Sequence, residues 1–77
     1  SDTFDKMAVV AKDNLPAHFA AEIDTLERLG ATYLGLWNGT PAYATRYSAV
    51  ERELRSYGYR RKFRMINGRK AGSFWAA

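Results

Sequence analysis

The chain has 77 residues, a single histidine, no cysteine and a net charge of +4. This length supports one domain over residues 1–77, with a marginal core whose stability is roughly 3 to 5 kcal/mol unless another contact adds to it. Without cysteine, disulfides and thiolate metal sites are excluded, and one histidine excludes a histidine-based metal cluster. We therefore expect neither a metal nor a cofactor.

Hydropathy and composition indicate a folded protein away from the membrane. Apolar residues make up 47% of the chain and aromatic residues 14%, which is ample for a core. No apolar run approaches the roughly 20 residues of a membrane-spanning helix, and no signal-peptide pattern opens the chain. We therefore expect no membrane partner. The absence of cysteine fits a reducing compartment, so we expect a cytoplasmic location.

Positive charge is concentrated in the last third of the chain. Residues 1–53 carry eight acids and five bases, a net of −3, whereas residues 54–77 carry seven bases and no acid, a net of +7. Six of the twelve lysines and arginines lie within residues 60–70. Such segregated charge favours a polyanionic partner, DNA or RNA. The alternative is a solvated face that only keeps the protein in solution.

Two helices are expected before Gly30. A helical stripe of apolar residues predicts a short helix within residues 4–12; the stripe consists of Phe4, Met7, Ala8 and Ala11. Pro16 suits the first turn of a second helix, and Gly30 is a natural C-terminal cap for it. The apolar side chains of this second helix are Leu15, Phe19, Ile23, Leu26 and Leu29.

A β-hairpin is expected over residues 32–47. The pair Asn38-Gly39 lies between runs rich in tyrosine, tryptophan and threonine, which is the pattern of two strands joined by a two-residue turn. Pro41 lacks an amide hydrogen, so its strand is expected at a sheet edge or to begin after it. The alternative is a helix that begins near Pro41 and continues into the next segment.

A third helix and a second hairpin complete the chain. Ser48 and Glu51 have the spacing of a capping box, in which each side chain satisfies a free amide at the start of a helix. That helix is expected to bury Val50, Leu54 and Tyr57 and to stop at Gly58. The pair Asn67-Gly68 then predicts a turn between two further strands.

These elements predict a small α+β fold with an α-αββ-αββ layout. Residues 16–47 and 48–77 form a near-repeat of helix, glycine cap, strand, Asn-Gly turn and strand. Two such units give a four-stranded antiparallel sheet with the helices on one face. Convergence on common glycine caps and Asn-Gly turns is the alternative to a true duplication, and the architecture is the same for both.

The second hairpin carries the candidate binding residues. Because side chains alternate along a strand, Arg60, Lys62 and Arg64 share one face, about 7 Å apart, roughly the spacing of successive phosphates. The other face carries Tyr59, Arg61, Phe63 and Met65, and we expect it to be buried. The return strand extends the patch with Arg69 and Lys70. The alternative is an edge strand that positive charge protects from aggregation.

Aromatic residues of the first hairpin form a second candidate surface. Tyr33, Trp37, Tyr43 and Tyr47 are expected on one face, opposite Leu34, Leu36, Ala42 and Ala44. If the leucine face packs on the helices, the aromatic face is free to stack on bases. Cross-strand aromatic pairing within the sheet is the favoured alternative, with Trp37 as the member expected to be exposed. Phe74 and Trp75 are expected in the core.

These patterns predict a non-enzymatic protein that binds DNA or RNA, of either strandedness, through its basic hairpin. The expected binding residues are Arg60, Lys62, Arg64, Arg69, Lys70, Arg61, Arg55 and Trp37. Arg61 is the least secure because it shares the apolar face. No arrangement of a nucleophile beside a base, or of a carboxylate beside His18, indicates catalysis, and the acids Glu22, Asp24 and Glu27 are expected on a solvated face.

Three alternatives remain open at the level of sequence. The same basic surface could bind an acidic protein, as an inhibitor or adaptor of the kind that mobile genetic elements encode. A winged helix is a weaker option, in which the helix from Ser48 is the recognition helix and the basic hairpin is its wing. An edge strand would also offer a route to a homodimer.

Overall fold

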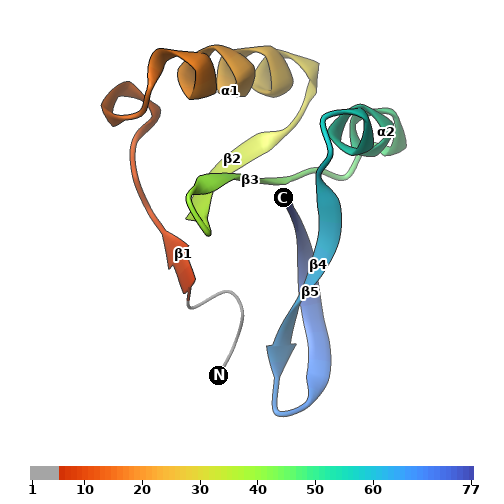
Figure 1. Cartoon of the computed structure of the whole chain (residues 1–77). Helices are drawn as coiled ribbons and strands as arrows, with labels where there is room; N and C mark the ends of the chain where they lie inside the picture. The colour runs from red at the N-terminus through yellow and green to blue at the C-terminus, as the bar shows by residue number, and fades with distance from the viewer. Residues whose placement is uncertain (1–5) are drawn as a thin grey trace.

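A computed structural model describes residues 6–77 and shows a small α+β fold with two α-helices and a five-stranded antiparallel sheet (Figure 1). In chain order the elements are β1 (Met7–Ala8), the 3-10 helix η2 (Lys12–Asn14), α1 (Ala17–Leu29), β2 (Thr32–Trp37), β3 (Thr40–Ala44), α2 (Ser48–Ser56), β4 (Arg60–Ile66) and β5 (Arg69–Ala76). The strand order in the sheet is β1-β2-β3-β5-β4. The expected helix–hairpin, helix–hairpin sequence is therefore present, but the sheet has five strands and not four.

The additional strand comes from the segment in which a helix was expected. Met7 and Ala8 pair with Trp37 and Leu36 of β2, so the prediction of a helix within residues 4–12 is wrong for the described part of that segment. Phe4, which belonged to the same predicted stripe, lies outside the described residues. A short isolated helix gains little in water, whereas β1 satisfies its backbone groups on the free edge of β2.

Gly35 makes room for β1. A Cβ atom at this position would lie 2.5 Å from the carbonyl oxygen of Ala8, and Gly35 has a φ of +144°, which only glycine adopts readily. The β2–β3 register also shifts between Tyr33 and Gly35. The glycine therefore serves both the irregularity in β2 and the close approach of the strand beside it.

Both Asn-Gly turns are confirmed. Asn38 and Gly39 have φ values of 52° and 81°, and Asn67 and Gly68 have φ values of 50° and 76°. Positive φ at both central residues defines the type I′ turn, whose twist matches that of the two flanking strands. Gly30 is also confirmed as the α1 cap, with a φ of 117° and its amide directed at the carbonyls of Glu27 and Leu26.

The start of α2 differs from the predicted capping box. Tyr47 is the N-cap and Ser48 is already helical, and no side chain caps this end. Glu51 instead accepts a hydrogen bond from Arg61 of β4 at 2.7 Å. The capping-box prediction is therefore wrong, because the carboxylate gains more from a guanidinium than from one backbone amide. The alternative helix from Pro41 is also wrong, since that residue lies in a strand.

Pro41 lies in an inner strand, which contradicts its expected place at an edge. β3 begins at Thr40 and lies between β2 and β5 in the sheet. However, β3 pairs with β5 at Tyr43↔Trp75, and no other pair joins these strands in the described residues. Pro41 therefore has no partner in β5, and its lack of an amide hydrogen costs no hydrogen bond to that strand.

The hydrophobic core has two parts, one on each face of the sheet. The larger cluster packs beneath the helices and consists of Ile23, Leu26, Ala31, Tyr43, Val50, Leu54, Tyr59 and Trp75, with Leu15 and Tyr33 at its border. The smaller cluster consists of Ala42, Phe74 and Ala76, with Met7, Leu34 and Trp37 packed against it. Phe74 and Trp75 are buried as expected, whereas Tyr57 is 42% exposed and not buried.

Candidate nucleic-acid interface

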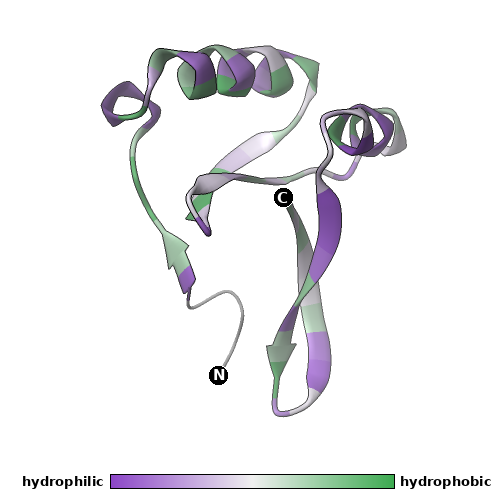
Figure 2. Cartoon of the chain, in the orientation of Figure 1, coloured by the Kyte–Doolittle hydropathy of each residue, from purple (hydrophilic) through white to green (hydrophobic). Residues whose placement is uncertain are grey.

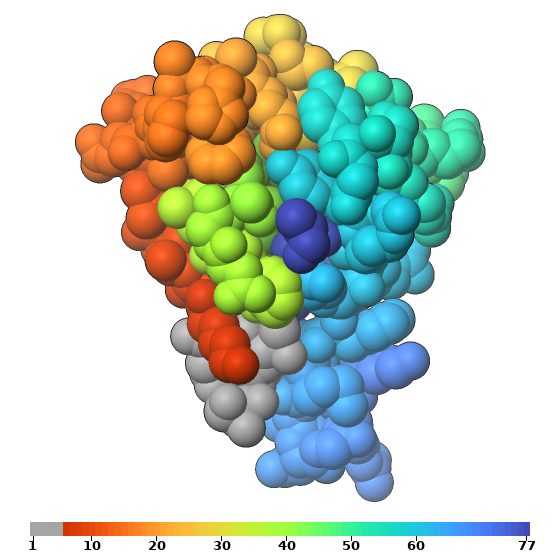
Figure 3. Space-filling model, in the orientation of Figure 1, coloured from red at the N-terminus to blue at the C-terminus, as the bar shows by residue number. Residues whose placement is uncertain are grey.

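The hairpin formed by β4 and β5 projects from the body of the protein. Its base is buried through Phe74, Trp75 and Ala76, whereas every β5 residue from Arg69 to Ser73 is exposed. Figure 1 shows the two strands extending away from α1 and α2, and Figure 3 shows the turn as the far end of the molecule. The end of the hairpin is therefore accessible to a large partner.

The register of the hairpin divides its side chains between two faces. Arg60 pairs with Ala76 and Lys62 with Phe74, and Arg64 pairs with Gly72 before the register shifts. Next to the turn, Ile66 pairs with Arg69. We call the first face the arginine face, and it carries Arg60, Lys62, Arg64 and Arg69. The second is the mixed face, and it carries Arg61, Phe63, Met65 and Lys70.

The expectation that the mixed face is buried holds only at the base of the hairpin. Tyr59, just before β4, is 5% exposed, but Phe63 is 36% exposed. Lys70 also lies on this face, opposite Met65, and its Nζ is 4.1 Å from the centroid of the Phe63 ring. The outer half of the hairpin therefore presents cations on both of its faces. Figure 2 shows hydrophilic segments, in purple, in both β4 and β5.

Arg61 is tied to the body of the protein. Its Nη2 lies 2.7 Å from Oε2 of Glu51, and its guanidinium carbon lies 5.3 Å from the centroid of the buried Trp75 ring. Arg55 of α2 lies over the same ring at 4.9 Å. Arg61 is thus a weaker candidate for binding a polyanion, because the carboxylate of Glu51 offsets its charge. Arg55 places a positive charge of α2 at the base of the hairpin.

Lys62 is held over an aromatic ring, which orients its charge without neutralising it. The Nζ atom lies 4.7 Å from the centroid of Trp37, and that indole packs against Phe74 in an edge-on arrangement at 6.2 Å. Trp37 is half-buried by these contacts, less open than expected. Arg60 donates from Nη1 to the carbonyl of Tyr59 at 2.9 Å. Arg60, Arg64 and Arg69 are all exposed.

The free aromatic surface expected on the first hairpin does not form. Tyr33 and Tyr43 belong to the cluster beneath the helices, where their rings pair edge-on across the strands at 6.4 Å. Trp37 belongs to the opposite cluster. The register shift at Gly35 is the reason, because one unpaired residue reverses the alternation of every side chain beyond it. Cross-strand pairing, the favoured alternative, is what the structure shows.

Glu22 is half-buried and accepts hydrogen bonds from two buried tyrosines, so its expected place on a solvated face is wrong. Its Oε2 accepts hydrogen bonds from Tyr43 at 2.7 Å and from Tyr59 at 2.6 Å. Burial, followed by the bond to Glu22, raises the pKa of both phenols above the usual range. A signal existed, because Glu22 lies three residues after Phe19 and four before Leu26, on the margin of the apolar stripe. It joins α1 to both hairpins.

The other two α1 acids form a surface network with Lys12 of η2. Lys12 contacts Asp24 closely and Glu27 at 3.4 Å. These hydrogen bonds raise the pKa of Lys12, and the bond from Lys12 lowers the pKa of Asp24. All three side chains are over a third exposed, so the network fits the solvated face expected for Asp24 and Glu27.

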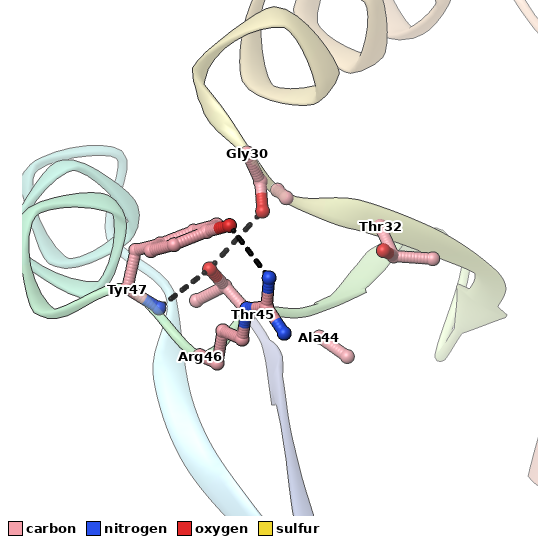
Figure 4. A pocket seen from close by; sticks show the side chains of 7 residues that line it. Gly30, Thr32, Ala44, Thr45, Arg46 and Tyr47 are labelled. Atoms are coloured by element: carbon pink, nitrogen blue, oxygen red, sulfur yellow. Dashed lines mark hydrogen bonds between the residues drawn. The ribbon is translucent and has the colours of Figure 1, made fainter.

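An open hollow of about 550 Å³ lies beside the α1–β2 junction (Figure 4). Its lining residues are Gly30, Ala31, Thr32, Ala44, Thr45, Arg46 and Tyr47. Thr45 donates to the Gly30 carbonyl at 3.2 Å and accepts from the Tyr47 amide at 3.1 Å. Arg46 donates to the Tyr47 hydroxyl at 3.1 Å. Thr45, Arg46 and Tyr47 thus use polar groups to bond to one another or to the Gly30 carbonyl, so we assign no ligand to this hollow.

Within residues 6–77 there is no group of three or more histidine, aspartate or glutamate side chains placed to hold a metal ion. In the same range no helix has the length and apolar character needed to cross a membrane. The fold and the hairpin define a small α+β domain with a projecting basic β-ribbon. No family model, curated protein or solved structure matches the chain.

Proposed function

We propose that the chain is a non-enzymatic nucleic-acid-binding protein that docks the β4–β5 hairpin on phosphates. The observation that supports this function is the exposed, projecting end of the hairpin with its cations. The residues that we assign to phosphate contact are Arg60, Lys62, Arg64, Arg69 and Lys70. Arg55 contributes from α2, and Trp37 acts by holding Lys62 in place.

The mechanism is electrostatic docking with counterion release. Alternate residues of a strand are about 7 Å apart, so the arginine face can follow successive phosphates of one backbone. Each phosphate neutralised on duplex DNA changes the slope of log K against log salt by about −0.9. Five contacts give a slope of about −4 to −5. Since phosphate contacts position a protein and do not read bases, this function requires no sequence specificity.

Fluorescence anisotropy with labelled oligonucleotides tests this function. A random DNA duplex, a single strand and an RNA are titrated at several salt concentrations, with wild type and with the Arg60→Glu/Lys62→Glu/Arg64→Glu variant. The matched control is Lys6→Glu/Arg28→Glu/Arg52→Glu, which changes the net charge equally at exposed positions outside the hairpin. We expect the hairpin variant to lose binding and the control to keep most of it. Equal losses in both variants, or no binding by wild type, would refute the function.

An acidic protein partner is the second candidate, and the position of β4 favours it. β4 is the outermost strand of the sheet and pairs with β5 alone in the described residues. An edge strand can accept a further strand from a partner, with acidic side chains opposite its cations. An acidic protein partner becomes the preferred function if the wild-type protein binds none of the three nucleic acids.

The winged-helix interpretation is not supported. The β2–β3 hairpin separates α1 from α2, whereas a winged domain places its helices together before the wing. Glu51 of the supposed recognition helix also bonds to Arg61 of the supposed wing.

A further inference from the structure

We infer that the partner is B-form duplex DNA and that the β4–β5 hairpin enters its major groove, with one face of the hairpin toward each phosphate backbone. This inference rests on the proposed function and specifies its substrate class. It distinguishes duplex DNA from a single strand and from duplex RNA.

The first argument is the distribution of charge over the hairpin. Arg64 and Arg69 lie on the arginine face, and Lys70 lies on the mixed face opposite Met65. All three are exposed. A ribbon that lies flat on a single strand can use the cations of only one face. A groove has a phosphate backbone along each wall, so cations on both faces are used together.

The second argument is thickness. A β-sheet with side chains on both faces occupies about 10 Å, the distance at which sheets stack. The major groove of B-DNA is about 12 Å wide and the minor groove about 6 Å. The major groove of A-form RNA is too deep and narrow for side chains to enter. Of these three grooves, only the major groove of B-DNA therefore accepts the hairpin without a large deformation.

The third argument is reach. The hairpin is exposed on both strands from Phe63 to Ser73, apart from the half-buried Met65. Four residues of a strand extend about 13 Å, which exceeds the roughly 8.5 Å depth of the major groove. Figure 1 shows both helices at the opposite end of the hairpin, so they do not obstruct its entry. The turn residues Asn67 and Gly68 would face the floor of the groove.

The side chains on the mixed face have a defined arrangement for this role. Lys70 lies over the Phe63 ring of the same face, with its Nζ 4.1 Å from the ring centroid. Lys62 is held over Trp37 on the arginine face. Each face therefore carries a lysine whose position is limited by an aromatic ring, which lowers the conformational entropy lost when a phosphate binds.

Groove-selective probes test the inference. The full chain is titrated with one duplex in three forms: unmodified, with bulky glucosylated 5-hydroxymethylcytosine in the major groove, and saturated with netropsin in the minor groove. The corresponding single strand and duplex RNA are titrated at the same salt concentration. We expect glucosylation and the change to RNA each to weaken binding by about tenfold or more, and netropsin to change Kd by less than about twofold.

Two single substitutions test whether both faces are used. Arg64→Ala removes a cation from the arginine face, and Lys70→Ala removes one from the mixed face. Each is expected to reduce the magnitude of the salt slope by about 0.9, whereas the control Arg28→Ala on α1 leaves it unchanged. Circular dichroism and thermal melting confirm that the variants are folded.

The outcomes separate this inference from the proposed function. Displacement by netropsin, equal affinity for single strands or RNA, or a loss confined to Arg64→Ala overturns the groove geometry while nucleic-acid binding stands. If no nucleic acid binds at moderate salt, both the function and the inference fail. If an acidic protein captures the hairpin in the absence of such binding, the second candidate function replaces them.

Discussion

The hydroxyl of Tyr59 lies 2.6 Å from Oε2 of Glu22, a residue 37 positions earlier in the chain. Tyr43 donates to the same oxygen from the end of β3. One carboxylate of α1 thus bonds to a residue of the first hairpin and to the residue that precedes the second. Because β3 and β5 share a single ladder pair, this contact is a principal link between the two halves of the fold.

Removal of the Glu22 carboxylate should destabilise the protein strongly. Glu22→Ala leaves two buried phenols without an acceptor, at a cost of about 1 to 3 kcal/mol for each unsatisfied group. Against a total stability of roughly 3 to 5 kcal/mol for a domain of this size, the variant is expected to be largely unfolded at room temperature. Urea denaturation followed by circular dichroism measures this.

The matched control for that experiment is Glu27→Ala on the same helix. Glu27 is exposed, and its side chain contacts the partly exposed Lys12 at 3.4 Å, so its loss should change the free energy of unfolding by less than about 0.5 kcal/mol. Similar values for the two variants would show that the tyrosine contacts contribute nothing special.

The same tyrosines make the stability sensitive to alkaline pH. Their pKa values are raised in the folded state, whereas an unfolded tyrosine titrates at about 10. Their contribution is therefore fully present below pH of about 10 and is lost as pH rises, because the unfolded chain releases its phenolic protons first. Each tyrosine contributes a slope of about −1.4 kcal/mol per pH unit above this value.

Tyr59→Phe isolates one of these groups. Urea denaturation at a series of pH values from 8 upward (about 8 to 11, spanning the phenol pKa) should show a shallower alkaline loss in this variant than in wild type. The lysines titrate in both proteins and cancel in the comparison. Parallel curves for the two proteins would contradict the assignment of the loss to Tyr59.

Gly35→Ala should displace β1. The new methyl group would lie 2.5 Å from the Ala8 carbonyl oxygen, closer than carbon and oxygen can approach, so the β1–β2 pairing must shift. Hydrogen exchange should show faster exchange of the amides in the β1–β2 ladder, and the free energy of unfolding should fall by about 1 to 3 kcal/mol.

Gly72→Ala is the control for backbone strain in that experiment. Gly72 has a φ of +148°, close to the +144° of Gly35, but a Cβ atom added there would meet no atom of a more distant residue within 4 Å. The difference between the two variants therefore measures the steric effect alone. If both lose the same stability and β1 keeps its protection, the close approach at Gly35 is unimportant.

Release of Arg61 from its carboxylate should strengthen nucleic-acid binding. Glu51→Gln removes the charge that faces the guanidinium at 2.7 Å, which adds an available cation at the base of the hairpin. We expect Kd to fall by about two- to fivefold and the magnitude of the salt slope to rise by up to about 0.9. Anisotropy titrations at three salt concentrations give both quantities.

Glu53→Gln carries the same change in net charge on the exposed side of α2 and serves as the reference. A larger effect of Glu51→Gln than of Glu53→Gln supports a local role for Arg61. Equal effects would mean that only the total charge of the protein matters.

Local chemistry predicted the turns, the glycine cap and both hairpins. The Asn-Gly pairs and Gly30 require positive φ, and that requirement depends on neighbouring residues alone. The α1 stripe likewise located Ile23 and Leu26 in the core. These features needed no knowledge of distant contacts.

The errors arose where a distant residue offers a better partner. Met7 and Ala8 form a strand because β2 has a free edge beside Gly35. Glu51 binds Arg61 in place of a helix amide. The faces of the first hairpin were misassigned because a one-residue register shift has no signature in the alternation of side chains. In the candidate site, the sequence located the cations but not the exposure of both faces of their hairpin.

The single Tyr43↔Trp75 pair between β3 and β5 has a mechanical consequence. A continuous ladder would resist rotation of one hairpin against the other along its whole length. With one pair, the angle between the projecting hairpin and the first hairpin depends on the side chains that pack around the buried Trp75. A load at the Asn67-Gly68 turn is therefore carried mainly by side-chain contacts, those of Trp75 with Arg55 of α2 and those of Phe74 and Lys62 with Trp37 of the first hairpin.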